Sequence, residues 1–153
     1  MQENAMIWKP NVTVAGVIRR DNRFLLVEEQ TDEGPCFNQP AGHLECQESL
    51  LDAVIREVRE ETRYDFEPRH LVGIYQWRHP HKDVTYLRVA FGGELTGHDP
   101  ERALDDGIIA PRWLTLDEAR ATASRHRSPL ILQCIEDCMA GRRYPLDLIR
   151  HYG

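Results

Sequence analysis

Three glutamates near the middle of the chain are the residues whose type and spacing most clearly suggest chemistry. Glu57, Glu60 and Glu61 lie in the stretch Ser49–Thr62, which contains neither proline nor glycine and is predicted to be a helix. Glu57 and Glu61 are four residues apart, so they share a face, where like charges repel by about 0.2–0.5 kcal/mol. A divalent cation would cancel this repulsion, and Mg²⁺ is commonly held by one or two carboxylates plus substrate phosphates. The glutamates therefore indicate a metal site, with a solvated acidic helix face as the alternative.

The residues around the glutamates are suited to position them. Ser49 stands directly before an apolar run and has a side chain preferred at a helix N-cap. The turn-rich segment Asn38–Gly42 can bring backbone carbonyls close to a bound ion. Arg56 adjoins Glu57, and its planar guanidinium is suited to orienting a carboxylate. These features predict a capped helix with a turn facing its acidic edge.

The spacing of these residues resembles the Nudix box. The matching positions are Gly42, Glu48, Arg56, Glu57, Glu60 and Glu61. The resemblance implies a hydrolase that uses Mg²⁺ or Mn²⁺ to cleave phosphoanhydride bonds. The family closes its box with a glycine, where this chain has Arg63. A glycine offers no side chain to a metal, so we expect this departure to affect stability or loop geometry rather than chemistry.

The resemblance reaches from Trp8 through nearly the whole chain and is strongest to the NudJ-type phosphatases within the family. It is carried by segments such as Lys9–Ala15, Asn38–Glu45, Arg127–Leu130 and Gly141–Leu146. It implies small-molecule substrates, namely hydroxymethylpyrimidine diphosphate, thiamin diphosphate and nucleoside di- and triphosphates. Residue chemistry by itself reaches only a metal-assisted phosphate hydrolase.

The resemblance also implies roles for the residues of the box. Glu57 and Glu61 are expected to be the main metal ligands, with Glu60 as a third or water-bridged ligand and the carbonyl of Gly42 as a backbone ligand. One glutamate is expected to orient or deprotonate the attacking water, so the expected catalytic residues are Glu57 and Glu60, with Arg56 as the orienter of Glu57. The family places its base inside the box in some members and in a later loop in others.

A few residues elsewhere have two interpretations each. Glu48, near the helix start, is expected to have an indirect structural role rather than to bind metal. Trp77 and Tyr86 are candidates for stacking on a substrate ring, or for core packing. Arg88 is a candidate phosphate contact, or part of a surface salt bridge. The acidic residues at 105–106 could supply a further carboxylate, but a surface loop is favoured.

The composition limits the class of protein. The chain has 153 residues, 41% of them hydrophobic, which predicts a single domain spanning 1–153 with residues 1–8 as a flexible N-terminal arm. A net charge of −6 argues against a nucleic-acid partner. The sequence contains neither a long apolar run nor a signal peptide, so a cytoplasmic location without membrane association is expected. The oligomeric state is left open between a monomer and a small homo-oligomer.

The four cysteines are expected to be reduced thiols. Cys134 and Cys138 are four residues apart, but their spacing is not that of a zinc knuckle, so zinc binding is not favoured.

The order of the predicted elements indicates an α+β protein. Apolar strands joined by hairpins are interleaved with a few helices, and the Nudix resemblance sharpens this to a mixed β-sheet sandwiched between α-helices (α/β/α). We expect Phe66–Pro68 to interrupt the strand pattern after the central helix. We expect Thr96–Ile109 to form a long acidic loop.

Two other functions remain open beside the phosphatase. The first is a nucleotide-pool-cleaning enzyme that acts mainly on nucleoside triphosphates and shares every residue of the box. The second is a Nudix domain that binds a nucleotide or metabolite as a sensor without hydrolysing it. Loss of a box glutamate would favour the sensor, and none is lost.

Overall fold

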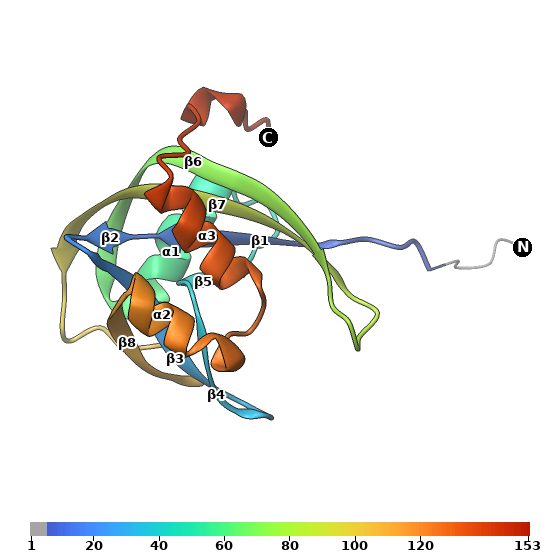
Figure 1. The fold of residues 1–153 in the computed structure, drawn as a ribbon. Coiled ribbons are helices and arrows are strands. Elements are labelled where there is room, and N and C mark those ends of the chain that lie inside the picture. Colours follow the sequence, from blue (N-terminus) through green and yellow to red (C-terminus); the bar gives the residue numbers. More distant parts are fainter. Residues whose placement is uncertain (1–5) are drawn as a thin grey trace, which may run out of the picture.

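The computed structural model describes residues 6–153, in which a run of strands precedes the first helix, a second run follows it, and the remaining helices come after the last strand (Figure 1). The strands are β1 (Asn11–Val17), β2 (Arg19–Arg20), β3 (Arg23–Thr31), β4 (Gly34–Asn38), β5 (Ala41–His43), β6 (Tyr64–Arg78), β7 (Thr85–His98) and β8 (Ile108–Thr115). The helices are α1 (Leu50–Thr62), α2 (Leu116–Ala121) and α3 (Leu130–Met139), with short 3₁₀ turns at Ala123–Arg125 and Leu146–Leu148. Most of the predicted N-terminal arm, residues 1–5, lies outside the described residues.

The strands form two sheets. The first has the order β5-β1-β7-β6 and is mixed, because β1 and β7 are parallel while the other pairs are antiparallel. The second contains β2, β3 and β4, and β8 pairs with β3. The first sheet joins two strands that precede α1, β1 and β5, to two that follow it, β6 and β7.

Helices cover the strands from opposite sides, so the prediction of an α/β/α arrangement is confirmed (Figure 1). Side chains alternate along a strand, and in β1 Val14 packs into the core under α1 while Ala15 packs into the core under α2 and α3. In the core under α1, the fully buried residues of that helix are Ala53, Val54 and Val58. Ile131 of α3 is fully buried in the second core.

The central helix begins and ends as its sequence predicts. The Ser49 hydroxyl accepts a hydrogen bond of 3.0 Å from the backbone N–H of Asp52, which caps the first turn of α1. The helix ends at Arg63, which adopts a left-handed conformation with φ of 68°. A side chain other than glycine costs roughly 1 kcal/mol in this conformation, so Arg63 occupies a position that favours glycine.

The predicted interruption at Phe66–Pro68 is wrong, because β6 runs through it from Tyr64 to Arg78. β6 is the last strand in its sheet, where a proline without an N–H is tolerated, and its register shifts between Pro68 and His70.

The predicted loop Thr96–Ile109 is shorter than expected. β7 continues to His98, which pairs with Tyr64, and β8 already begins at Ile108. Only residues 99–107 remain as a loop. Pairing with β6 and β3 therefore extended both strands beyond their local sequence pattern. None of the helices within residues 6–153 is long and apolar enough to cross a membrane.

Candidate metal centre and active site

The acidic edge of α1 lies against β5. Glu57 and Glu61 are buried, each only 7% exposed, although both carry carboxylates. The backbone of Gly42 lies so close to Glu57 that a Cβ atom at position 42 would be 2.2 Å from Glu57 Oε1. The absence of a side chain at Gly42 is therefore what leaves room for the Glu57 carboxylate.

Three carboxylates converge at this edge. One carboxylate oxygen from each of Glu57, Glu60 and Asp105 lies within 4.8 Å of the others. The backbone N–H of Asp105 donates a hydrogen bond of 3.0 Å to the Glu60 carbonyl, which holds the 99–107 loop against α1. Asp105 is exposed, as a surface loop predicts, but it also joins the cluster. The interpretation of Asp105 as a surface-loop residue is therefore incomplete. Asp105 lies outside the spacing of the Nudix box, so the sequence pattern did not indicate that it would join the cluster.

Glu61 occupies a neighbouring position rather than a place in this cluster of three. Its Oε1 accepts a hydrogen bond of 2.8 Å from the backbone N–H of Ala41, next to Gly42. Glu61 is one helical turn beyond Glu57 and faces the same segment of chain. The box glutamates therefore line one continuous acidic edge.

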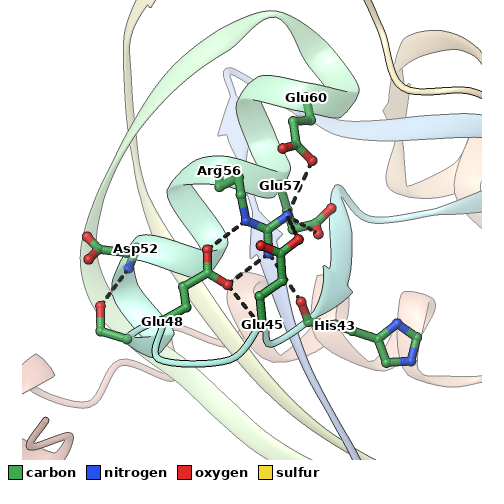
Figure 2. A network of polar contacts seen from close by, with 8 residues as sticks. His43, Glu45, Glu48, Asp52, Arg56, Glu57 and Glu60 are labelled. Atoms are coloured by element: carbon green, nitrogen blue, oxygen red, sulfur yellow. Dashed lines mark hydrogen bonds and ion pairs between the residues drawn. The ribbon is translucent and has the colours of Figure 1, made fainter. Parts of the chain in front are cut away.

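Arg56 connects the carboxylates around it (Figure 2). Its Nη1 donates to Glu57 Oε1 at 2.7 Å and to Glu60 Oε2 at 3.3 Å. Its Nε and Nη2 form two hydrogen bonds with the Glu48 carboxylate, at 2.6 and 2.9 Å. Glu45 completes the group, 3.5 Å from Nη1. Glu48 thus contacts Arg56, and Arg56 in turn holds the carboxylates of Glu57 and Glu60 in place.

The surroundings of the carboxylates disfavour their ionised forms when no cation is bound. Burial raises the pKa of Glu57 to about 7, and the hydrogen bond from Arg56 opposes this change only in part. Burial also raises the pKa of Glu61 to about 9. The pKa of Glu60 is raised for the same leading reason. Such an edge gains most from a cation that compensates the ionised carboxylates.

These shifts predict how the effect of metal on stability changes with pH. The folded pKa values of Glu57 and Glu61 lie above the ordinary value of 4.5, so their stabilising contribution is complete below pH 4.5 and is lost as pH rises through about 7 and 9. A metal binds the ionised carboxylates and must displace protons at lower pH. We expect the increase in melting temperature caused by Mn²⁺ to grow between about pH 6 and pH 9. Thermal unfolding with Mn²⁺ and with chelator measures this, and an increase independent of pH would contradict it.

The candidate substrate residues lie on the first sheet. Trp77 of β6 and Tyr86 of β7 are cross-strand partners, with ring centroids 5.9 Å apart and planes 18° apart. Both are half-buried, so neither belongs to the closed core. Arg88 lies two residues beyond Tyr86 on the same face and is only 6% exposed. Its Nη1 donates to Gln39 Oε1 at 2.6 Å and its Nη2 to Asn38 Oδ1 at 2.9 Å.

Arg88 is therefore not part of a surface salt bridge. Among residues 6–153 it forms no ion pair, and its two hydrogen-bond acceptors are neutral amides. The four cysteines are free, and none belongs to the carboxylate cluster found in the described part of the chain.

A family model of the NUDIX domain matches residues 8–134. The chain belongs to the Nudix family. Phosphatase NudJ of Escherichia coli (strain K12) is 41% identical over 147 residues, which cover 96% of this chain and 95% of that protein. The predicted likeness to NudJ-type phosphatases is thereby confirmed. This Nudix protein is a hydrolase of phosphorus-containing acid anhydrides, and its family generally uses a divalent metal.

Solved structures agree with this assignment. A NUDIX hydrolase from Nitrosomonas europaea is 51% identical, with a TM-score of 0.92 over 94% of this chain and 98% of that one. A bifunctional NMN adenylyltransferase/ADP ribose pyrophosphatase from Francisella tularensis, complexed with AMP and a Mn ion, shares the fold with 20% identity. Its TM-score is 0.68 over 90% of this chain and 43% of that one.

Proposed function

We propose that this Nudix hydrolase releases phosphate from small di- and triphosphates in a reaction that depends on Mg²⁺ or Mn²⁺. The observation that carries the proposal is the convergence of Glu57, Glu60 and Asp105 beside Gly42. Oxygen ligands are those that Mg²⁺ prefers, and Mg²⁺ is commonly held by carboxylates together with substrate phosphates. The residues present therefore fit the metal that the family uses.

Glu57, Glu60 and Asp105 would hold the ion, with Glu61 and the Gly42 carbonyl as the further ligands proposed from the box. When bound, the metal neutralises phosphate charge and polarises the phosphorus–oxygen bonds. By holding the cation, these residues would bring the anionic phosphates to the acidic edge of α1, which would otherwise repel them.

The chain itself orients the reacting groups. Arg56 fixes the carboxylates of Glu57 and Glu60 through Nη1, and Glu48 fixes Arg56 through two parallel hydrogen bonds. Paired hydrogen bonds to a planar guanidinium define its orientation as well as its distance. We propose Glu57 or Glu60 as the group that takes a proton from the attacking water, since both place a carboxylate at the cluster.

We propose that the sheet face carrying Trp77 and Tyr86 binds the organic part of the substrate. Half-buried aromatic rings offer a flat apolar surface to a heterocycle. Arg88 contributes through Asn38 rather than by direct contact with phosphate, because it is buried. A guanidinium only donates, so Asn38 must direct its amide oxygen at Arg88 and its NH₂ group away from it. That NH₂ group is available to donate to a ligand.

Thiamin-related diphosphates, namely hydroxymethylpyrimidine diphosphate and thiamin diphosphate, are the proposed substrates, with nucleoside di- and triphosphates beside them. The likeness to an E. coli protein named a phosphatase over nearly the whole chain supports release of phosphate. We also propose that the protein acts in the cytoplasm, as a monomer or small homo-oligomer, with no nucleic-acid or membrane partner. The charge of −6 supports the absence of a nucleic-acid partner.

The test is phosphate release from these compounds, measured with Mg²⁺, with Mn²⁺ and with chelator. Metal-dependent turnover that is fastest on the thiamin-related diphosphates is the expected result. A preference for a nucleoside triphosphate, with pyrophosphate as product, would replace the proposal with the pool-cleaning function. Metal binding without turnover on any compound would favour the sensor.

Substitution of Trp77 by leucine tests the proposed ring-binding face. The change removes a stacking surface worth about 1–3 kcal/mol, so KM should rise roughly 5- to 160-fold while kcat changes little. Steady-state kinetics on hydroxymethylpyrimidine diphosphate measures both constants. A fall in kcat at unchanged KM would show that Trp77 does not serve substrate binding.

A further inference from the structure

Arg63 stands where the Nudix box ends in glycine, and its left-handed backbone is the conformation that glycine adopts most easily. A residue other than glycine persists in this conformation where the surrounding structure holds it there. The contacts of Arg63 show which part of the structure does so.

The side chain of Arg63 reaches the loop that follows β7. Its Nε donates a hydrogen bond of 2.6 Å to the backbone carbonyl of Arg102, which is 39 residues further along the chain. The loop returns two contacts, because the Asp99 N–H and Arg102 Nη1 donate to the Arg63 carbonyl at 3.2 and 3.3 Å. Arg102 Nη1 also forms an ion pair of 2.9 Å with Asp65. Arg63 at the end of α1 and Arg102 in the loop thus each donate a hydrogen bond to the backbone carbonyl of the other.

This loop carries Asp105, the one member of the carboxylate cluster that does not come from α1. Asp105 lies near Glu57 and Glu60, so these carboxylates repel one another when they are ionised and no cation is bound. The loop must therefore be held against α1 by other contacts. Its backbone does so at Asp105, through the hydrogen bond to the Glu60 carbonyl, and Arg63 does so three residues earlier at Arg102.

We propose that Arg63 is a positioning residue that holds the 99–107 loop against α1 and so keeps Asp105 at the metal centre. The proposal rests on the proposed function, because it takes the carboxylate cluster to be the site of the metal. Arg63 itself touches neither metal nor substrate. A glycine at position 63 would relax the backbone but leave the Arg102 carbonyl without its side-chain donor.

The test is the variant Arg63→Gly, with Mn²⁺ binding measured by electron paramagnetic resonance and folding by thermal unfolding without metal. Loss of one hydrogen bond at the loop predicts an Mn²⁺ affinity weaker by about 3- to 10-fold. Relief of the left-handed conformation offsets the lost bond, so the melting temperature should change by less than about 3 °C. Amide exchange at Asp105 should quicken by a similar 3- to 10-fold, because its bond to Glu60 opens more often.

Two further variants separate this role from general stability. Arg63→Lys keeps a flexible donor and should restore most of the Mn²⁺ affinity. Asp21→Gly removes a left-handed non-glycine residue with φ of 55° from the turn between β2 and β3, and it should leave Mn²⁺ affinity unchanged. Equal affinity of Arg63→Gly and the unsubstituted protein would overturn the inference while leaving the metal site standing. Failure of the unsubstituted protein to bind Mn²⁺ would overturn both.

Discussion

Replacement of Glu57 by glutamine is expected to lower kcat by about 100-fold or more while the protein stays folded. Glutamine has the shape of glutamate but lacks the charge that a divalent cation requires. Glu57 is buried, belongs to the carboxylate cluster and is held by Arg56 at 2.7 Å, so other side chains cannot easily take its place. The same change at Glu61, which is equally buried, is expected to have a comparable effect. Phosphate release at limiting Mg²⁺ measures both.

The matched control is Asp52→Asn, which makes the same change of charge on an exposed residue of the same helix. Its turnover should remain within about twofold, since Asp52 does not belong to the carboxylate cluster. Circular dichroism and thermal unfolding of all three variants check that the fold is kept. Near-normal kcat in both the Glu57 and Glu61 variants would overturn the assignment of the metal centre.

Substitution of Gly42 by alanine is expected to lower kcat/KM by about 100-fold, since a displacement of roughly 1 Å at a reacting group can cost this much. The added Cβ would be 2.2 Å from Glu57 Oε1 and 2.3 Å from its Cδ, far inside any permitted contact. The carboxylate must therefore move, which breaks its alignment with Arg56. The clash is with a side chain rather than with backbone, so we expect the fold to persist.

A double variant decides whether Gly42 acts through Glu57. If it does, adding Gly42→Ala to Glu57→Gln should cost little beyond the glutamine change, because residues that act as a unit are not additive. Steady-state kinetics of the two single variants and the double variant completes the cycle. If the fold-loss of the double variant equals the product of the two single fold-losses, Gly42 affects catalysis independently of Glu57.

The sequence itself determined the parts of the protein that depend on local pattern. The central helix followed from a cap at Ser49 and an uninterrupted run to Thr62, and α1 spans Leu50–Thr62. Thr115 and Glu118 form a capping box at the start of α2, and their spacing of three residues is the local pattern typical of a helix N-terminus. Family membership followed from the long spacing that begins at Gly42. In each case the informative residues lie close together in the chain, so their interactions can be inferred from their order.

Only the tertiary structure decided which distant residues join the site. Asp105 comes 45 residues after Glu60, and it reaches the cluster because β6 and β7 pair as far as His98 and return the loop to the end of α1. Arg88 carries no sequence mark of burial, yet its strand lies in the interior of the sheet beside β1. The sequence likewise gave no indication that Arg63 would contact Arg102. Contacts of this kind depend on strand register and on the packing of a helix end against a loop. Neither is encoded by the spacing of the residues involved.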